Sequence, residues 1–266
     1  MTKKIGFIGV GNMGSAIIKG LASRDDVEIH GVDLHGAALA KLGKECGLVA
    51  QDSAKDLAKV CDYIVIAVKP QHAEPVVKDI ARELTADKCL ISICAGLTTA
   101  HFKEWTKHQS PVVRVMPNTP ALVNEGVFAI SLEDSDLTDD MKETVPSIFE
   151  GIGQVHILAE KQFDAFTGVI GSGPAYVYYF MESMIEAGVA LGLTRQQVTE
   201  MVKGLFLGSS KLASESEFSV TQLREMVSSP GGTTIRALMH FDRQAVKGDI
   251  IDAVFESYKR SIELGK

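Results

Sequence analysis

The sequence lacks several features that define whole classes of protein. Its 27 Lys and Arg residues are outnumbered by 34 Asp and Glu, the net charge is −7 and no long basic run occurs, which disfavours nucleic-acid binding. No run of about 18 apolar residues is present, so no membrane span is expected. The first residues include two lysines but lack the apolar segment and cleavage site of a signal peptide. We therefore expect a cytoplasmic protein with neither a membrane nor a nucleic-acid partner.

Cysteine is also scarce, and its placement argues against a metal site. The four cysteines, Cys46, Cys61, Cys89 and Cys94, form no CxxC pair, and none lies near a histidine at metal-ligand spacing. Cys89 and Cys94 fall in or beside an apolar run, which is typical of small core residues. Free thiols used in this way indicate a reducing compartment.

What the sequence does contain is a large apolar fraction and a change of periodicity. Of the 266 residues, 45 % are hydrophobic, which is enough for a substantial core. In the first half, strand-length runs nearly continuous in Val and Ile alternate with helical stretches, as in a sheet covered on both faces. Strands are predicted over residues 3–10, 27–33, 62–70, 88–96, 111–118, 125–132 and 153–160. The alternation predicts an α/β domain at residues 1–159 with a doubly wound parallel sheet, the last two strands lying at its edge.

From about residue 160 the pattern is purely helical. Helices are predicted over residues 173–193, 194–212, 221–228, 233–242 and 249–264. Thr194, just before the residues RQQ, is expected to cap the second of them. The first of these is apolar on most faces, and about 100 residues of such helices offer too little interior to bury themselves. We expect residues 160–266 to form an all-helical domain through which two copies associate.

The motif GVGNMG places three glycines in GxGxxG spacing after a predicted strand and at the start of a predicted helix. In a Rossmann-like fold, Gly9 permits a tight turn, Gly11 lets the backbone approach a pyrophosphate, and Gly14 lets helix and strand pack closely. The helix N-terminus then faces the phosphates. The alternative is a plain strand–helix turn. The predicted cofactor contacts in this motif are Ile8, Gly9, Gly11, Asn12, Met13 and Gly14.

Asp33 ends the second predicted strand, about 20 residues after the glycines. A carboxylate there can accept hydrogen bonds from an adenosine ribose, which favours NADH, and would repel the ribose phosphate of NADPH. The alternative is that Asp33 caps the following helix. That helix contains Lys41 and no Arg, so the choice between NADH and NADPH stays open.

The other cofactor candidates end later strands, because ligands of an open parallel sheet bind beyond the carboxyl ends of its strands. In the segment AVKP they are Ala67, Val68, Lys69 and Pro70. Ala95 and Asn118 follow the next two strands. Lys69 could instead be a solvated loop lysine.

Together these motifs resemble one family, pyrroline-5-carboxylate reductase. The blocks IGFIGVGNMGSAI, AVKP, RVMPNTPALVNEG, GSGPAYVY and LREMVSSPGGTTIRAL are similar to those of that family and occur in its order over nearly the whole chain. The resemblance implies reduction of the ring C=N bond of 1-pyrroline-5-carboxylate to L-proline, the last step of proline biosynthesis, with NADPH or NADH. It also implies an intertwined helical homodimer, often assembled into a ring of dimers.

The segment SSPGGTT, residues 228–234, interrupts the helical half and fits the carboxylate of that substrate. Its two glycines allow backbone N–H groups to turn inward as an anion nest, and its two threonines begin the next helix. An ordinary helix cap would explain one threonine but not the glycine pair with a second hydroxyl. The predicted substrate contacts are Ser229, Gly231, Gly232, Thr233 and Thr234.

The sequence contains no obvious proton donor, and the chemistry does not demand one. A cyclic imine takes up a proton readily, so the main requirement is to position the hydride donor against the ring. The catalytic candidates are Thr234 and Glu217. The resemblance places Glu217 near the ring nitrogen, whereas on sequence alone it is one carboxylate of the solvated run ASESEF.

Two other functions fit parts of the sequence. Hydroxyacid dehydrogenases with a similar glycine motif use a lysine on the first helix of a helical domain, but residues 173–193 contain no Lys. A redox-sensing NAD(P)-binding regulator without turnover would need no pocket for a small acid. Assays with imine and hydroxyacid substrates distinguish the three.

Overall fold

The computed structural model describes residues 2–265, which form two compact units. The first contains the chain up to Ser172 together with the segment from Ser257 onward, and the second is Gly173–Glu256. The last helix therefore begins in the second unit and ends in the first. The domain boundary predicted at residue 160 divides the chain differently and stays a prediction.

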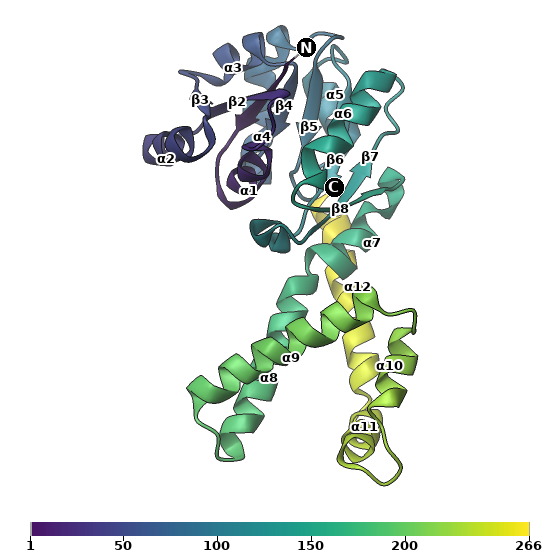
Figure 1. Ribbon diagram of the computed structural model, residues 1–266. Helices are drawn as coiled ribbons and strands as arrows, with labels where there is room; N and C mark the ends of the chain where they lie inside the picture. The colour runs from purple at the N-terminus through teal and green to yellow at the C-terminus, as the bar shows by residue number, and fades with distance from the viewer. Residues whose placement is uncertain (1, 266) are drawn as a thin grey trace. The chain divides into compact units, whose positions relative to one another are not determined.

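The first unit is built on an eight-stranded sheet of order β3-β2-β1-β4-β5-β6-β7-β8 (Figure 1). The strands are β1 (Lys3–Ile8), β2 (Val27–Val32), β3 (Val49–Ala50), β4 (Tyr63–Ile66), β5 (Cys89–Ser92), β6 (Val112–Met116), β7 (Gly126–Ser131) and β8 (Gly153–Ile157). Neighbouring strands are parallel except β6 and β7. These two are antiparallel because only the short turn η2 (Thr119–Val123) joins them, and a parallel pair needs a longer crossover. The two-residue β3 was not predicted, and β8 forms the sheet edge with β7 beside it.

Helices cover both faces of this sheet, as predicted for a doubly wound fold (Figure 1). One face is covered by α1 (Asn12–Leu21), α2 (Gly36–Cys46) and α6 (Asp139–Glu150), and the other by α3 (Ala54–Val60), α4 (Pro70–Ile80) and α5 (Thr99–Trp105). Strands β4 and β5 are buried along their whole length, which explains their nearly continuous apolar sequence. The two larger apolar clusters of the core therefore lie on opposite faces of the sheet.

Helices form the second unit, and only part of their apolar surface is buried in it. They are α8 (Gly173–Ala190), α9 (Arg195–Glu215), α10 (Val220–Met226), α11 (Thr233–Arg243) and the first part of α12 (Val246–Leu264). The best-packed contact joins α8 to α9, where a Cβ on Gly188 would lie 2.3 Å from Cγ2 of Val198. Thr194 caps α9, as predicted. Within residues 2–265, no helix has the length and apolar character needed to cross a membrane.

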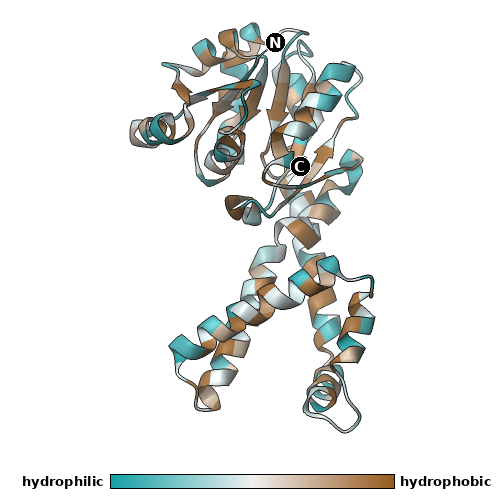
Figure 2. Ribbon diagram, viewed as in Figure 1, coloured by the Kyte–Doolittle hydropathy of each residue, from teal (hydrophilic) through white to brown (hydrophobic). Residues whose placement is uncertain are grey.

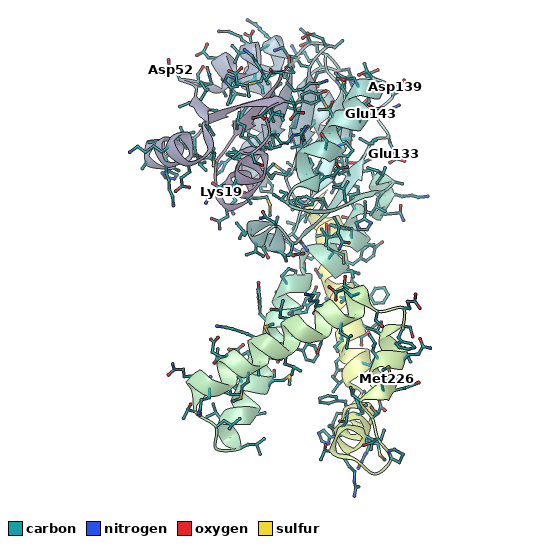
Figure 3. The ribbon with its side chains drawn as sticks, in the orientation of Figure 1. Lys19, Asp52, Glu133, Asp139, Glu143 and Met226 are labelled. Carbon is teal, nitrogen blue, oxygen red and sulfur yellow. The ribbon has the colours of Figure 1, made fainter. Side chains whose placement is uncertain are left out.

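Hydrophobic residues lie along every helix of this unit (Figure 2). Many of their side chains are open to solvent in the single chain. On α9, Met201, Leu205 and Leu212 are 58, 50 and 58 % exposed. Met226, at the end of α10, is also exposed (Figure 3). Burying one such side chain fully contributes roughly 1.5–3 kcal/mol. A surface with many of them is therefore expected to be covered by a second chain.

Candidate functional site

The glycine motif forms the turn between β1 and α1, and its three glycines serve different purposes. Gly9 has a φ of +98°, and a Cβ there would lie 2.8 Å from the carbonyl oxygen of Ala67. A Cβ on Gly14 would lie 2.5 Å from the carbonyl oxygen of Gly9, so a larger residue would push α1 away from the strand. At Gly11, a Cβ would meet nothing within 4 Å. The backbone at Gly11 is thus open to an approaching group, while the other two glycines allow the turn itself.

The N-terminus of α1 is suited to an anion. Gly11 is its N-cap residue, and no side chain caps the helix. The first N–H groups of a helix have no acceptor within it, and the helix dipole favours negative charge there. Asn12 and Met13 begin this first turn, and the Ser15 hydroxyl donates to the Val10 carbonyl at 2.6 Å. The turn is therefore held from within, while its N–H groups remain available to a phosphate.

This turn lies where the strand order reverses. The chain builds β1, β2 and β3 in one direction and then adds β4 on the opposite side of β1. In doubly wound sheets, ligands bind beyond the carboxyl ends of the strands at this point. The Ala67 N–H donates to the Ile8 carbonyl at 2.9 Å, and a Cβ on Gly9 would lie 3.1 Å from the Val68 nitrogen. The structure thus brings the ends of β1 and β4 together, as the motifs predicted.

The Asp33 carboxylate is partly buried beside the glycine turn. Its Oδ2 accepts a hydrogen bond from the Val10 N–H at 2.7 Å, and its Oδ1 accepts one from the His35 N–H at 2.8 Å. The N-cap residue of α2 is His35, and α2 receives no side-chain cap. The alternative that Asp33 caps this helix is therefore wrong. Asp33 ties the glycine turn to the end of β2, a contact that the sequence did not predict.

The next candidates follow β4 and β5. Lys69 is the N-cap residue of α4 with an exposed side chain, and Pro70 is the first residue of the helix, where its missing N–H costs nothing. Ala95 lies partly buried between β5 and α5. All three are at the same edge of the sheet as the glycine turn, since β1, β4 and β5 are adjacent and parallel.

Asn118 follows β6 and is 7 % exposed. Its Oδ1 accepts from the Val127 N–H at 2.9 Å, and its Nδ2 donates to the Ile170 carbonyl at 3.4 Å. Ile170 belongs to η4 (Thr167–Gly171), a π-helical turn of a kind often found at functional sites. Both ends of the Asn118 amide are thus bound by the chain itself. No signal in the sequence indicated the π-helical turn.

Cys94 lies two residues beyond β5 and is only 2 % exposed. Its Sγ donates to the carbonyl oxygens of Val68 at 3.4 Å and Ile66 at 3.6 Å. Burial raises the pKa of the Cys94 thiol to about 11, so it is neutral at physiological pH and a poor nucleophile. Cys89 is buried too, which confirms the core positions predicted for both. No three His, Cys, Asp or Glu side chains within residues 2–265 are grouped to hold a metal ion.

In the second unit, the segment predicted to form an anion nest lies in the loop between α10 and α11. Gly231 has a φ of +69°, which favours glycine, and Gly232 is the N-cap residue of α11. The Gly232 N–H donates to the Ser229 carbonyl at 3.1 Å, and a Cβ on Gly232 would lie 2.5 Å from the Ser229 Oγ. Thr233 and Thr234 form the first turn of α11, and no side chain caps it. The loop thus combines a tight turn with uncapped N–H groups and nearby hydroxyls.

Glu217 stands apart from this loop in the chain. It lies exposed between α9 and α10, and the whole of α10 (Val220–Met226) separates it from Ser229. Its predicted position before the helix that leads to the loop agrees with the structure, but its catalytic role stays a prediction.

Comparisons with known proteins agree with this geometry. Residues 160–264 match the family model described as Pyrroline-5-carboxylate reductase dimerisation, and residues 4–96 match the one described as NADP oxidoreductase coenzyme F420-dependent. With the sheet and the glycine turn, they define a dinucleotide-binding oxidoreductase that has a helical dimerisation domain. The dimerisation match also indicates a homo-oligomer, in keeping with the exposed apolar helices.

Full-length relatives narrow this class to one family. The chain is 35 % identical to the pyrroline-5-carboxylate reductase of Escherichia coli (strain K12), with 100 % of both chains covered. A Plasmodium falciparum pyrroline carboxylate reductase, solved with NADP bound, is 35 % identical with a TM-score of 0.86, covering 99 % of this chain and 98 % of that one. The Coxiella burnetii pyrroline-5-carboxylate reductase is 32 % identical with a TM-score of 0.91 and 100 % coverage of both chains. The chain belongs to the pyrroline-5-carboxylate reductase family, which confirms the resemblance seen in its motifs.

Proposed function

We propose that this chain reduces the ring C=N bond of 1-pyrroline-5-carboxylate to give L-proline, the last step of proline biosynthesis. The reductant is NADPH or NADH. The observation that carries the proposal is the intact glycine turn at the reversal of strand order, in a chain similar over its full length to reductases of this name. Gly11 is the decisive residue, since its open Cβ position leaves room for a pyrophosphate.

The first unit supplies the cofactor contacts. The N–H groups of Gly11, Asn12 and Met13 bind the pyrophosphate at the uncapped N-terminus of α1. Gly9 and Gly14 allow the turn, and Ile8 ends the strand that leads into it. The remaining contacts flank the dinucleotide beyond the strand ends and are Asp33, Ala67, Val68, Lys69, Pro70, Ala95 and Asn118. When bound, the reduced dinucleotide supplies the hydride.

The choice between the two dinucleotides rests on opposing observations. The Plasmodium falciparum relative binds NADP, which supports NADPH. The Asp33 carboxylate would repel a ribose phosphate, which supports NADH. Its two oxygens already accept hydrogen bonds from the N–H groups of Val10 and His35. Measuring kcat/KM with each dinucleotide decides the preference.

The loop of the second unit binds the carboxylate of the substrate. The backbone of Gly231 and the uncapped first turn of α11, which follows its N-cap residue Gly232, offer N–H donors, and Ser229, Thr233 and Thr234 offer hydroxyls. Charge-assisted bonds of this kind are about twice as strong as neutral ones. They fix the ring so that its C=N carbon can receive the hydride.

The reaction also consumes one proton, which ends on the ring nitrogen. The imine is basic enough to be protonated before reduction, so the chain needs only to favour its charged form. Glu217 contributes a negative charge for this purpose, and the Thr234 hydroxyl holds the ring nitrogen in place. These two residues are the proposed catalytic groups.

The test is a turnover assay with the purified full chain. Oxidation of NADPH or NADH is followed by absorbance in the presence of 1-pyrroline-5-carboxylate, and proline is identified by mass spectrometry. We expect stoichiometric proline and dinucleotide oxidation. Turnover of a hydroxyacid but not the imine would favour a hydroxyacid dehydrogenase. Dinucleotide binding with no turnover of either substrate would favour a redox-sensing regulator.

We further propose that the chain forms a homodimer through its helical unit, assembled into a ring of dimers in the cytoplasm. Exposed apolar side chains along α9 support the dimer. The net charge of −7 makes a nucleic-acid partner unexpected. Light scattering on the purified protein gives the mass and so distinguishes a dimer from a ring.

A further inference from the structure

The end of the chain returns to the first unit and packs there through specific contacts. Ser257 and Ser172 share a hydrogen bond of 2.9 Å between their hydroxyls. One turn later, Ser261 is 4 % exposed and donates to Oδ1 of Asp164 at 2.6 Å. A Cβ on Gly168, in the π-helical turn, would lie 3.2 Å from the backbone of Tyr258. The last turns of α12 are thus fixed against α7 (Phe163–Phe166) and η4.

The end of this segment packs against Gly96, in the turn that follows β5. Gly96 has a φ of +79°, and a Cβ on it would lie 3.2 Å from both the Cβ and the carbonyl oxygen of Leu264. A Cβ on Gly265 would in turn lie 2.9 Å from the carbonyl oxygen of Gly96. The two backbones therefore touch directly, and both contacts depend on the absence of a side chain.

Gly96 belongs to the turn that frames the proposed cofactor site. It is adjacent to Ala95, and Cys94 just before it donates to the carbonyls of Ile66 and Val68. Contacts therefore continue from the chain end to the turn after β5 and on to the segment after β4. None of these side chains is proposed to contact the substrate or to take part in catalysis. These contacts therefore affect the reaction only by positioning the cofactor-binding segments.

We propose that residues 261–265, here called the C-terminal latch, position the cofactor-binding edge of the sheet by holding the turn at residues 94–96. The role in cofactor binding rests on the proposed function. The latch residues are positioning residues, since they act through Gly96 and Cys94 on the segment Ile66–Val68. With the latch absent, the turn is free to move and the dinucleotide binds less tightly.

Two chain lengths test the latch with little risk of unfolding. A variant that ends at Glu263 loses both backbone contacts with Gly96, and a control lacks only Lys266. Because Leu264 is 56 % exposed, its loss removes little buried apolar surface. We expect KM for the dinucleotide to rise about tenfold in the shorter variant, because small displacements of binding groups are costly. KM for 1-pyrroline-5-carboxylate and all constants of the control stay within about twofold.

Alkylation of the cysteines gives a second readout that needs neither substrate nor turnover. The buried thiols Cys61 and Cys89 are internal controls for Cys94, since all three are at most 2 % exposed. After treatment with N-ethylmaleimide for different times, mass spectrometry measures the rate of alkylation at each cysteine. We expect Cys94 alone to react faster in the variant ending at Glu263, by about tenfold, because a thiol reacts according to its access and thiolate fraction. Added NADPH slows that reaction again.

The outcomes separate the latch from the proposed function. Equal alkylation rates of Cys94 in the variant ending at Glu263 and in the control overturn the latch. Equally faster alkylation of Cys61, Cys89 and Cys94 also overturns it, because that result indicates a general loosening of the fold. Faster labelling at Cys94 with an unchanged dinucleotide KM also overturns the role in cofactor binding. A full-length chain that binds no dinucleotide contradicts the proposed function, while the labelling comparison still decides whether the latch holds the turn.

Discussion

The Asp33 carboxylate accepts a hydrogen bond from the backbone N–H of Val10 at 2.7 Å, so a side chain at the end of β2 holds the turn that follows β1. The two residues are 23 positions apart in the chain. A hydrogen bond to a charged group contributes roughly 1.5–3 kcal/mol. Asp33 is therefore a structural part of the glycine turn as well as a candidate for ribose recognition.

Substituting Asp33 separates these two roles. Asp33→Ala removes the acceptor that holds Val10, so we expect KM for both NADH and NADPH to rise by about tenfold. Steady-state kinetics with each dinucleotide measures the effect, and Asp33→Asn, which retains one acceptor oxygen, is the matched control. If NADPH binding improves while NADH binding weakens, ribose discrimination dominates instead.

The glycine turn allows a paired test at Gly11 and Gly14. Gly11→Val places its side chain in open space, so we expect the melting temperature to change by no more than a few degrees. Dinucleotide binding, measured by calorimetry, should weaken at least tenfold because the pyrophosphate can no longer approach. Gly14→Val clashes with the Gly9 carbonyl and should lower both stability and binding. Unimpaired binding by Gly11→Val would rule out a pyrophosphate at this turn.

A valine at position 232 tests the anion nest. A Cβ on Gly232 would lie 2.5 Å from the Ser229 Oγ, so Ser229 must move and the nest is distorted. We expect Gly232→Val to raise KM for 1-pyrroline-5-carboxylate by about tenfold or more, equivalent to about 1.4 kcal/mol. Dinucleotide affinity, measured by fluorescence quenching without substrate, should stay unchanged. Loss of both affinities to the same degree would argue against the assignment of this loop.

The exposed apolar residues of α9 predict the effect of a charge on assembly. Leu205 is 50 % exposed in the single chain. If it is covered by a second chain, Leu205→Asp buries an unpaired charge there and should dissociate the assembly. Sedimentation velocity gives the mass, and Lys203→Ala on the same helix is the control, because its exposed pair with Glu200 contributes about 0–1 kcal/mol. An unchanged mass for Leu205→Asp would place the interface on other helices.

Local patterns in the sequence were sufficient to predict most of the secondary structure. Continuous Val and Ile runs predicted β4 and β5 because strands covered on both faces have no polar side. The glycine spacing predicted the turn after β1, where Gly9 and Gly14 meet steric limits imposed by the backbone and Gly11 leaves open space. Thr194 was predicted as a cap from the residues immediately after it.

Contacts between distant residues could not be predicted in this way. The bond from Asp33 to Val10 and the two bonds of the Asn118 amide depend on where separate elements meet. The antiparallel pairing of β7 and the return of α12 to Gly96 are likewise properties of the assembled chain. The sequence by itself determined the elements, the dinucleotide-binding turn and the family, because these follow from local periodicity, spacing and steric need. The tertiary structure alone decided which side chains hold that turn and where the chain end packs, because such contacts form only when the core brings remote segments together.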